Sequence, residues 1–173
     1  GTNEAATISQ GFRYALSCAS AHPPNITGFF EIFGGGFGSL KPDEKFVVAG
    51  GAGYSIAGDD RVHQSAKLAE KVIVAGMVSQ PCLEGLLDGA SCIVLPLTQG
   101  GGTNLKTAEA LWAGKHIVMM NVEADVTIGA YLKSEADRLG VTYSLGAGDE
   151  PSSCMELIEF VSAMGHTIVA AGK

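Results

Sequence analysis

One stretch, residues 92–121 (CIVLPLTQGGGTNLKTAEALWAGKHIVMMN), limits the folds open to this chain more than any other. It begins with a continuous apolar run, residues 92–97, of the kind that forms a fully buried parallel strand. A glycine triplet and a polar turn follow, and then a segment with apolar residues at helical spacing that stops near Gly114. Residues 116–120 are the next apolar run. The pattern predicts a strand, a glycine-rich turn, a helix and a second strand. The residues predicted to form the inward face of this helix are Leu105, Ala108, Leu111 and Trp112.

The glycine-rich turn is the candidate ligand site of the chain. Gly100, Gly101 and Gly102 have no Cβ, so their backbone can turn tightly and come close to a ligand. Thr103 or Asn104 can cap the following helix by accepting a hydrogen bond from a free backbone N–H. In open α/β sheets, anionic ligands bind where a helix N-terminus meets the carboxyl end of a strand. The sequence therefore predicts that an anion binds at this turn.

Composition limits the other function classes. The chain has 173 residues, enough for one well-buried domain and too few for two. A net charge of −7 argues against a nucleic-acid surface. Cys18, Cys82, Cys92 and Cys154 match no zinc or redox spacing, so we interpret them as small apolar residues in a reducing compartment. We therefore predict no metal, no cofactor and no nucleic-acid partner.

No apolar run reaches the length of a membrane span, and the first residues show no signal-peptide pattern. The expected location is the cytoplasm, or the cytoplasm of an expression host, and no membrane partner is predicted.

Apolar runs alternate with helical segments along the whole chain, which predicts an α/β fold. The expected arrangement is one doubly wound, Rossmann-like parallel sheet with helices on both faces, in a single domain of residues 1–173 with a lead-in at 1–12. The seven predicted strands are residues 13–20, 46–49, 72–75, 92–97, 116–120, 141–144 and 167–170. The other predicted helices are residues 26–33, 59–70, 78–90, 125–139 and 151–164.

A second glycine cluster, residues 50–53, follows the predicted strand 46–49. It is a weak match to the dinucleotide-binding pattern, because its third glycine is out of place and no acidic residue ends the next strand. We predict a plain turn there.

Residues 13–114 resemble the C-terminal, donor-binding domain of retaining group 1 glycosyltransferases, which have two Rossmann-like domains. The resemblance is carried by AHPPN at 21–25, FVVAG at 46–50 and GGGTNLKTAEALWAGK at 100–115. It implies that the glycine turn holds the diphosphate of a nucleotide sugar, with Lys106 beside the phosphates and Glu109 bonded to the ribose. Many members carry an acidic residue near the sugar where this chain has Gly101. The alternative for Lys106 and Glu109 is an exposed helix pair worth only ~0.2–0.5 kcal/mol.

The predicted phosphate- and nucleotide-binding residues are therefore Gly100, Gly101, Gly102, Thr103, Asn104, Lys106 and Glu109. The predicted ligand is a nucleoside diphosphate, a nucleotide sugar or an anion from solution. No catalytic residue is predicted.

Residues 115–173 show a different resemblance, to the later part of the nucleotide-binding domain of homoserine-dehydrogenase-like oxidoreductases, a group related to deoxyxylulose-phosphate reductoisomerase. It implies that Asn121 and Glu123 lie near the nicotinamide end and that Asp149 and Glu150 face a catalytic domain. The two resemblances meet near residues 114–121.

Our first interpretation is a recombined or designed chimera of two Rossmann-like halves, joined near 114–121, with weak nucleotide binding at residues 100–109 and no turnover. The alternative is the nucleotide-sugar-binding domain of a glycosyltransferase. One family that matches both sides of the seam would argue against the chimera. An open edge strand, such as the last one, is also a candidate for pairing with a second copy of the chain.

Overall fold

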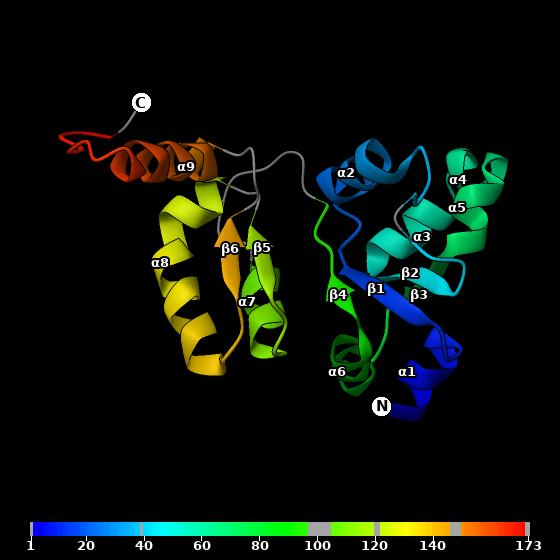
Figure 1. Ribbon diagram of the computed structural model, residues 1–173. Helices are drawn as coiled ribbons and strands as arrows, with labels where there is room; N and C mark the ends of the chain where they lie inside the picture. Colours follow the sequence, from blue (N-terminus) through cyan, green and yellow to red (C-terminus); the bar gives the residue numbers. More distant parts are fainter. Residues whose placement is uncertain (1, 39, 97–104, 120–121, 146–149, 172–173) are drawn as a thin grey trace. The chain divides into compact units, whose positions relative to one another are not determined.

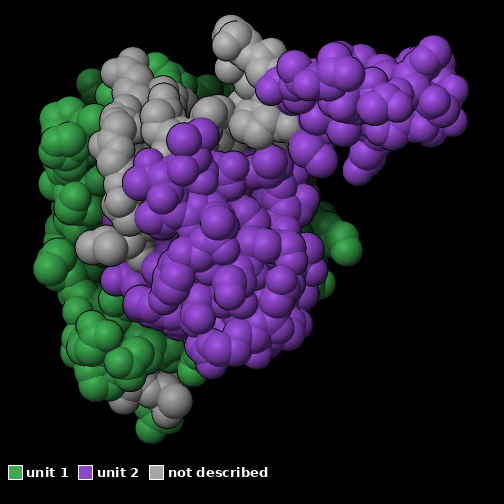
Figure 2. Space-filling view, turned by 90° about the vertical axis from the view of Figure 1, so that its left-hand side faces the viewer, with its two compact units in different colours: residues 1–100 green, residues 101–173 purple. Residues whose placement is uncertain are grey.

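The computed structural model describes residues 2–38, 40–96, 105–119, 122–145 and 150–171. The chain divides into two compact units, residues 1–100 and 101–173, which Figure 2 distinguishes by colour. Each unit is described by itself.

Unit 1 contains a four-stranded parallel sheet with the strand order β3-β2-β1-β4 (Figure 1). Strand β1 pairs with β2 on one side, with Leu16 opposite Val47, and with β4 on the other side, with Leu16 opposite Ile93. The chain therefore adds strands in one direction from β1 to β3 and then returns to the far side of β1 for β4. The strands are β1 (Arg13–Cys18), β2 (Glu44–Ala49), β3 (Val72–Gly76) and β4 (Cys92–Ile93).

Helices cover both faces of this sheet, as predicted. Helices α1 and α6 pack together on one face, and helices α2 to α5 cover the other face (Figure 1). The helices are α1 (Thr2–Ser9), α2 (Pro23–Phe33), α3 (Gly51–Ala57), α4 (Asp60–Gln64), α5 (Ala66–Lys71) and α6 (Gln80–Gly89).

Side chains of strand β2 pack into two hydrophobic clusters, one on each face of the sheet. Successive side chains of a strand point to opposite faces. Phe46 and Val48 accordingly pack into a cluster with Phe29, while Val47 packs on the opposite face with Leu86. All five side chains are at most 1% exposed, and each contributes roughly 1.5–3 kcal/mol by its burial.

Unit 2 is a second β-α-β arrangement. Strands β5 (Ile117–Met119) and β6 (Tyr143–Leu145) form a two-stranded parallel sheet joined through α8 (Val122–Leu139). Helix α7 (Leu105–Trp112) packs on both β5 and α8, and the last helix is α9 (Glu150–Ala163).

The buried face of α7 differs from the predicted one. Thr107, Ala110 and Leu111 are buried, whereas Trp112, which we expected to face inward, is 58% exposed. Thr107, Ala110 and Leu111 have the spacing i, i+3 and i+4, so they lie along one side of the helix. The prediction was wrong because it assigned the apolar Trp112 to the core and excluded the polar Thr107.

Seven strands in one sheet were predicted, but the described residues form six strands in sheets of four and two. Residues 167–170 are not a strand, and Val169 is 94% exposed. An apolar run forms a strand only where a neighbouring strand and a packing surface receive it. This segment therefore offers no strand edge, and pairing of the chain with a second copy through another edge stays a prediction.

Two helical predictions also need correction. Residues 2–9, predicted as a lead-in, form α1, because Ala5 and Ile8 lie on one side of the helix and pack with the cluster around α6. The helix predicted over 59–70 is interrupted at Ser65, whose hydroxyl accepts a hydrogen bond from the Leu68 amide and so begins α5 as an N-cap.

The glycine cluster at 50–53, predicted as a plain turn, begins helix α3 directly after β2. Gly50 has a φ of +90°, and a Cβ there would overlap the carbonyl oxygen of Ala19. A Cβ on Gly51 would lie 3.1 Å from the Ala21 nitrogen, and one on Gly53 would lie 3.0 Å from the Val48 carbonyl oxygen. These glycines let the chain segments after β1 and β2 pack closely together.

We predict that Gly50→Ala destabilises the protein by roughly 2–4 kcal/mol, since it adds a strained φ to a clash with backbone. Gly35→Ala is the matched control, because a Cβ there meets nothing within 4 Å. Urea unfolding followed by circular dichroism measures both. Equal urea midpoints for Gly50→Ala and Gly35→Ala would show that residue 50 tolerates a Cβ.

A part-buried polar contact ties α8 to β6 in unit 2. The Tyr143 hydroxyl donates a hydrogen bond of 2.6 Å to Asp125 Oδ1. Burial, followed by this bond to Asp125, raises the pKa of Tyr143 well above its usual value. Gly129 is buried one helical turn after Asp125, and a Cβ on it would overlap the carboxylate. The glycine therefore leaves the space that this contact needs.

Gly129→Ala should destabilise unit 2 by about 1 kcal/mol or more, although the same change in an ordinary helix interior stabilises by about that amount. The control is Ser134→Ala on the exposed side of α8, which should be neutral or slightly stabilising. Amide hydrogen exchange of Ile117, which donates to the Thr142 carbonyl, reports the stability of the sheet. Slower exchange in Gly129→Ala would contradict the proposed role of the glycine.

Candidate functional site

The strand order of unit 1 reverses between β1 and β4. In open α/β sheets, ligands bind outside the carboxyl ends of the strands at such a switch point. The two strands are held in register there, with Ala15 opposite Cys92 and the Val94 amide donating to the Leu16 carbonyl over 2.8 Å. The segments that leave these strands are the loop Ala19–His22, after β1, and the residues after Pro96, which begin the glycine turn. The switch point therefore lies at the carboxyl ends of β1 and β4, and in the sequence the glycine turn follows β4.

The loop after β1 is fixed by hydrogen bonds on both sides. The Ala19 amide donates to the Ala49 carbonyl over 2.9 Å, and the Ala19 carbonyl accepts from the Ala52 amide over 3.0 Å. Asn25 is 8% exposed, and its Nδ2 donates to the Ser20 carbonyl over 2.9 Å and to Ser20 Oγ over 3.3 Å. A surface loop is thus held by a buried polar side chain.

The N-termini of two helices in unit 1 do not offer free amides to an anion. Helix α2 begins with Pro23 and Pro24, which have no N–H, and the Asn25 amide already donates to the His22 carbonyl. At the start of α6, Ser79 Oγ caps the Cys82 amide and donates to the Glu4 carboxylate over 3.2 Å. A carboxylate already occupies the positive end of that helix.

The N-terminus of helix α3 is covered by the loop after β1. Its Ala52 amide donates to the Ala19 carbonyl, and the loop after β1 lies against Gly51. The glycine cluster that most resembles a dinucleotide site thus has its helix start covered by the chain itself. In unit 1, the starts of α2, α3 and α6 therefore give no candidate anion site.

The structure places the predicted site residues as follows. Gly100, Gly101, Gly102, Thr103 and Asn104 lie outside the described residues, as do Asn121 and Asp149 of the oxidoreductase resemblance. Lys106 is half-buried and Glu109 is exposed, both on α7, away from its buried stripe. Three residues apart on a helix, they are close enough in position to face one ligand. Their roles in binding stay predictions.

Sequence reasoning missed Asn25. The segment AHPPN at 21–25 entered only as part of a resemblance, which gives no reason for a polar residue after two prolines. The available signal was local: an Asn in the first turn of a helix whose start lacks N–H groups is free to bond backward to the preceding loop.

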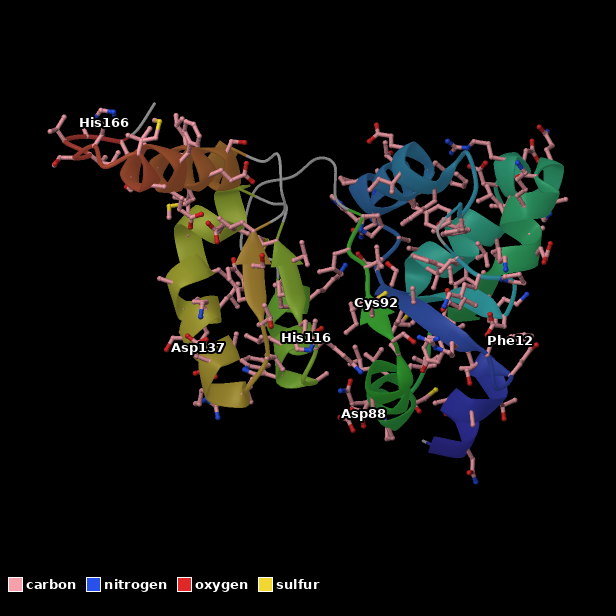
Figure 3. All side chains as sticks on the ribbon, in the orientation of Figure 1. Phe12, Asp88, Cys92, His116, Asp137 and His166 are labelled. Carbon is pink, nitrogen blue, oxygen red and sulfur yellow. The ribbon has the colours of Figure 1, made fainter. Side chains whose placement is uncertain are left out.

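No metal centre is found among the described side chains. In unit 2, His116 precedes β5, Asp137 lies on α8 and His166 follows α9, and the three side chains do not converge (Figure 3). His116 instead has a structural contact, since its Nδ1 accepts a hydrogen bond of 2.9 Å from the Thr142 amide beside the β5–β6 pair.

The four cysteines are free thiols. Cys82 is fully buried, and burial, with Glu4 nearby, raises the pKa of its thiol, which disfavours the reactive thiolate. Cys92, in contrast, is exposed on β4, so the expectation of buried apolar cysteines does not hold for it. Within the part of the chain that the structure describes, no helix has the length and apolar character to span a membrane.

Comparison with solved structures shows a shared fold. The crystal structures of HepE from Anabaena in complex with UDP and with UDP-glucose match this chain with TM-scores of 0.54 and 0.55 at 12% sequence identity. The matches cover 96% and 95% of this chain and 44% of HepE, so the chain spans less than half the length of that protein. At this identity the likeness establishes the fold. A search of curated protein sequences gives no significant match.

Comparison with protein families gives a clearer result. The family model of group 1 glycosyl transferases matches residues 37–139, more than half of the chain. This match runs across the predicted seam at 114–121, so one family accounts for residues on both sides of it. The comparisons lend no support to the oxidoreductase resemblance of residues 115–173. The chain belongs to the group 1 glycosyl transferases.

Proposed function

We propose that this chain binds the nucleotide sugar donor of a group 1 glycosyltransferase. The observation that carries the proposal is the family match over residues 37–139, because it includes the whole strand–turn–helix segment from β4 to α7. The solved neighbours were crystallised with UDP and UDP-glucose, which supports a nucleotide sugar as the ligand class. The chimera without a site is the weaker interpretation, because it needs two families where one matches across the seam.

The diphosphate is assigned to the start of α7. Backbone N–H groups of residues 101–104 would bind it, aided by the positive end of the helix dipole. Lys106 adds a point charge in the first turn of the helix, and Glu109, one turn later, bonds the ribose. This division suits the α7 geometry, because the opposite side of the helix is occupied by the buried Ala110 and Leu111.

The expected affinity is low. Hydrogen bonds and ion pairs on a solvent-facing helix side contribute only about 1 kcal/mol each. A few such contacts give a dissociation constant near one millimolar, about 4 kcal/mol. We assign no catalytic residue.

Titration of the full chain with UDP should shift the backbone amides of residues 100–109 in NMR spectra. Lys106→Ala should weaken binding about three- to tenfold, since it removes a charge-assisted contact to phosphate. Lys133→Ala is the matched control, because Lys133 is paired with Asp137 on α8 and its removal changes the net charge equally.

Two results would contradict this proposal. The first is a set of amide shifts elsewhere that leaves residues 100–109 unchanged. The second is equal weakening by Lys106→Ala and Lys133→Ala, which would show a net-charge effect. A parallel titration with GDP measures the contribution of the base.

The role of Glu109 has its own test. UDP should bind more tightly than 2′-deoxy-UDP, and Glu109→Gln should reduce that difference, because a neutral amide is a weaker acceptor for a ribose hydroxyl than a carboxylate. The ratio of the two dissociation constants is the measurement. An unchanged ratio would leave Glu109 as a surface residue of α7.

A further inference from the structure

We propose that His116 makes the β5–β6 sheet of unit 2 sensitive to pH. The neutral imidazole holds the entrance of the sheet, and the sheet loosens when His116 takes up a proton. The inference goes beyond the proposed function, because it concerns the stability of unit 2 and requires no ligand. It involves only groups that belong to unit 2.

The entrance of the sheet is the place where residues 116–117 meet Thr142. The Thr142 amide donates to His116 Nδ1 over 2.9 Å, and the Thr142 carbonyl accepts from the Ile117 amide over 2.8 Å. The ladder begins directly after these bonds, with Ile117 opposite Tyr143. In a regular parallel ladder such an amide donates to a backbone carbonyl. A side chain therefore supplies an acceptor at the start of this sheet, between segments 26 residues apart.

The acceptor exists in only one protonation state of His116. A neutral imidazole has one nitrogen with a hydrogen and one with a lone pair, whereas an imidazolium carries a hydrogen on both. Since Nδ1 accepts, it has the lone pair, and Nε2 carries the hydrogen. Protonation turns Nδ1 into a second donor facing the Thr142 N–H. Because His116 is exposed, a proton reaches it without any opening of the fold.

The entrance matters because the sheet is short. The ladder of β5 and β6 joins three pairs of residues among those described. Each strand starts just after a glycine turn, at Gly114 and at Gly140, where φ is +71° and +69°. The two bonds of Thr142 join the ends of these turns to each other. Loss of one of them should therefore loosen the adjacent ladder.

The direction of the pH effect follows from which form of His116 makes the bond. The bond stabilises the folded state only while the imidazole is neutral, so folding disfavours the charged form. The stabilisation is therefore complete at the alkaline side of the titration and is lost as the pH falls. Histidine ordinarily changes charge between about pH 5 and about pH 8. The sheet should be most stable at the upper end of this interval.

Other titratable groups lie on the elements packed around β5 and β6. The pKa of Tyr143 is raised by burial and by its bond to Asp125, so it keeps its proton in this interval. The pKa of Glu135 is lowered by the hydrogen bond from Arg138, so it stays ionised. Carboxylates, ammonium groups and guanidinium groups ordinarily titrate outside the interval. The described titratable side chains on α7, the turn after it, α8 and β6 are Lys106, Glu109, Lys115, Asp125, Tyr131, Lys133, Glu135, Asp137, Arg138 and Tyr143.

Amide hydrogen exchange of the full chain, expressed as protection factors, tests the inference. Between about pH 7.5 and about pH 5, the protection of Thr142, Ile117 and Val118 should fall roughly three- to tenfold, as expected for the loss of one hydrogen bond. The amides of Leu16 and Val47 in unit 1 are the internal control and should change less than about twofold.

Two variants separate the bond from the charge. His116→Asn should keep the protection at both pH values, because Asn Oδ1 is attached to Cγ, as Nδ1 is in histidine, and accepts without titrating. His116→Ala should have the reduced protection at both pH values. His166→Asn is the matched control, since His166 is another exposed histidine of unit 2 and its replacement should leave the pH dependence in place.

Three results would overturn the inference. The first is a pH dependence that persists in His116→Asn, because the titrating group would then lie elsewhere. The second is equal protection at the two pH values in the unchanged chain, or an equal fall in unit 1. The third is a nitrogen-15 NMR spectrum that places the imidazole hydrogen of His116 on Nδ1 at about pH 8. The proposed function is unaffected by any of them, since no ligand is present.

Discussion

The arrangement of unit 1 depends on the central position of β1, a strand paired on both edges and covered on both faces. Parallel strands need crossover connections, so all of them begin at one end of the sheet and finish at the opposite end. The segments that follow the strands therefore start from the carboxyl end of the sheet. The reversal of strand order singles out the segments that follow β1 and β4. Burial of Leu16 and Val47 on one face, and of Phe46 and Val48 on the other, holds β1 and β2 in register beside the switch point. The same buried side chains thus supply packing energy and determine the strand arrangement that creates the switch point.

Glycine clusters meet two different needs in this chain. At residues 50–53 the structure explains each glycine by the chain itself: a positive φ at Gly50, and close approaches of neighbouring backbone at Gly51 and Gly53. That cluster packs the loop after β1 against the start of α3, where the Ala52 amide already donates to the Ala19 carbonyl. The cluster at 100–102 precedes a helix whose outer side carries Lys106 and Glu109. A glycine cluster before a helix is therefore no sign of a ligand site by itself, because the cluster at 50–53 is explained by packing.

Sequence patterns predicted well those features that depend on local burial. The apolar runs at 46–49 and 72–75 are strands β2 and β3, and the helix expected after the glycine turn begins and ends at Leu105 and Trp112. The errors arose where tertiary contacts decide: α1 is stable because Ala5 meets α6, and residues 167–170 lack a strand to pair with. The same contrast between local pattern and tertiary contact applies to the polar residues. Lys106 and Glu109 could be named from a motif, whereas the role of Asn25 depends on where the loop after β1 lies, which no local pattern contains.

The two family resemblances illustrate the same limit. A helix followed by a buried strand is common to every Rossmann-like parent, so similarity over such an element reflects the shared requirements of a parallel sheet. In unit 2 those requirements include a small residue, Gly129, beneath the Asp125–Tyr143 contact and a buried stripe along α8 at Leu132 and Ala136. These residues preserve packing and carry no information about a nicotinamide or a sugar. The group 1 match covers residues 37–139, which include the turn and helix at 100–109. The group 1 match runs through 114–121, so one family covers both sides of the point where the resemblance changes.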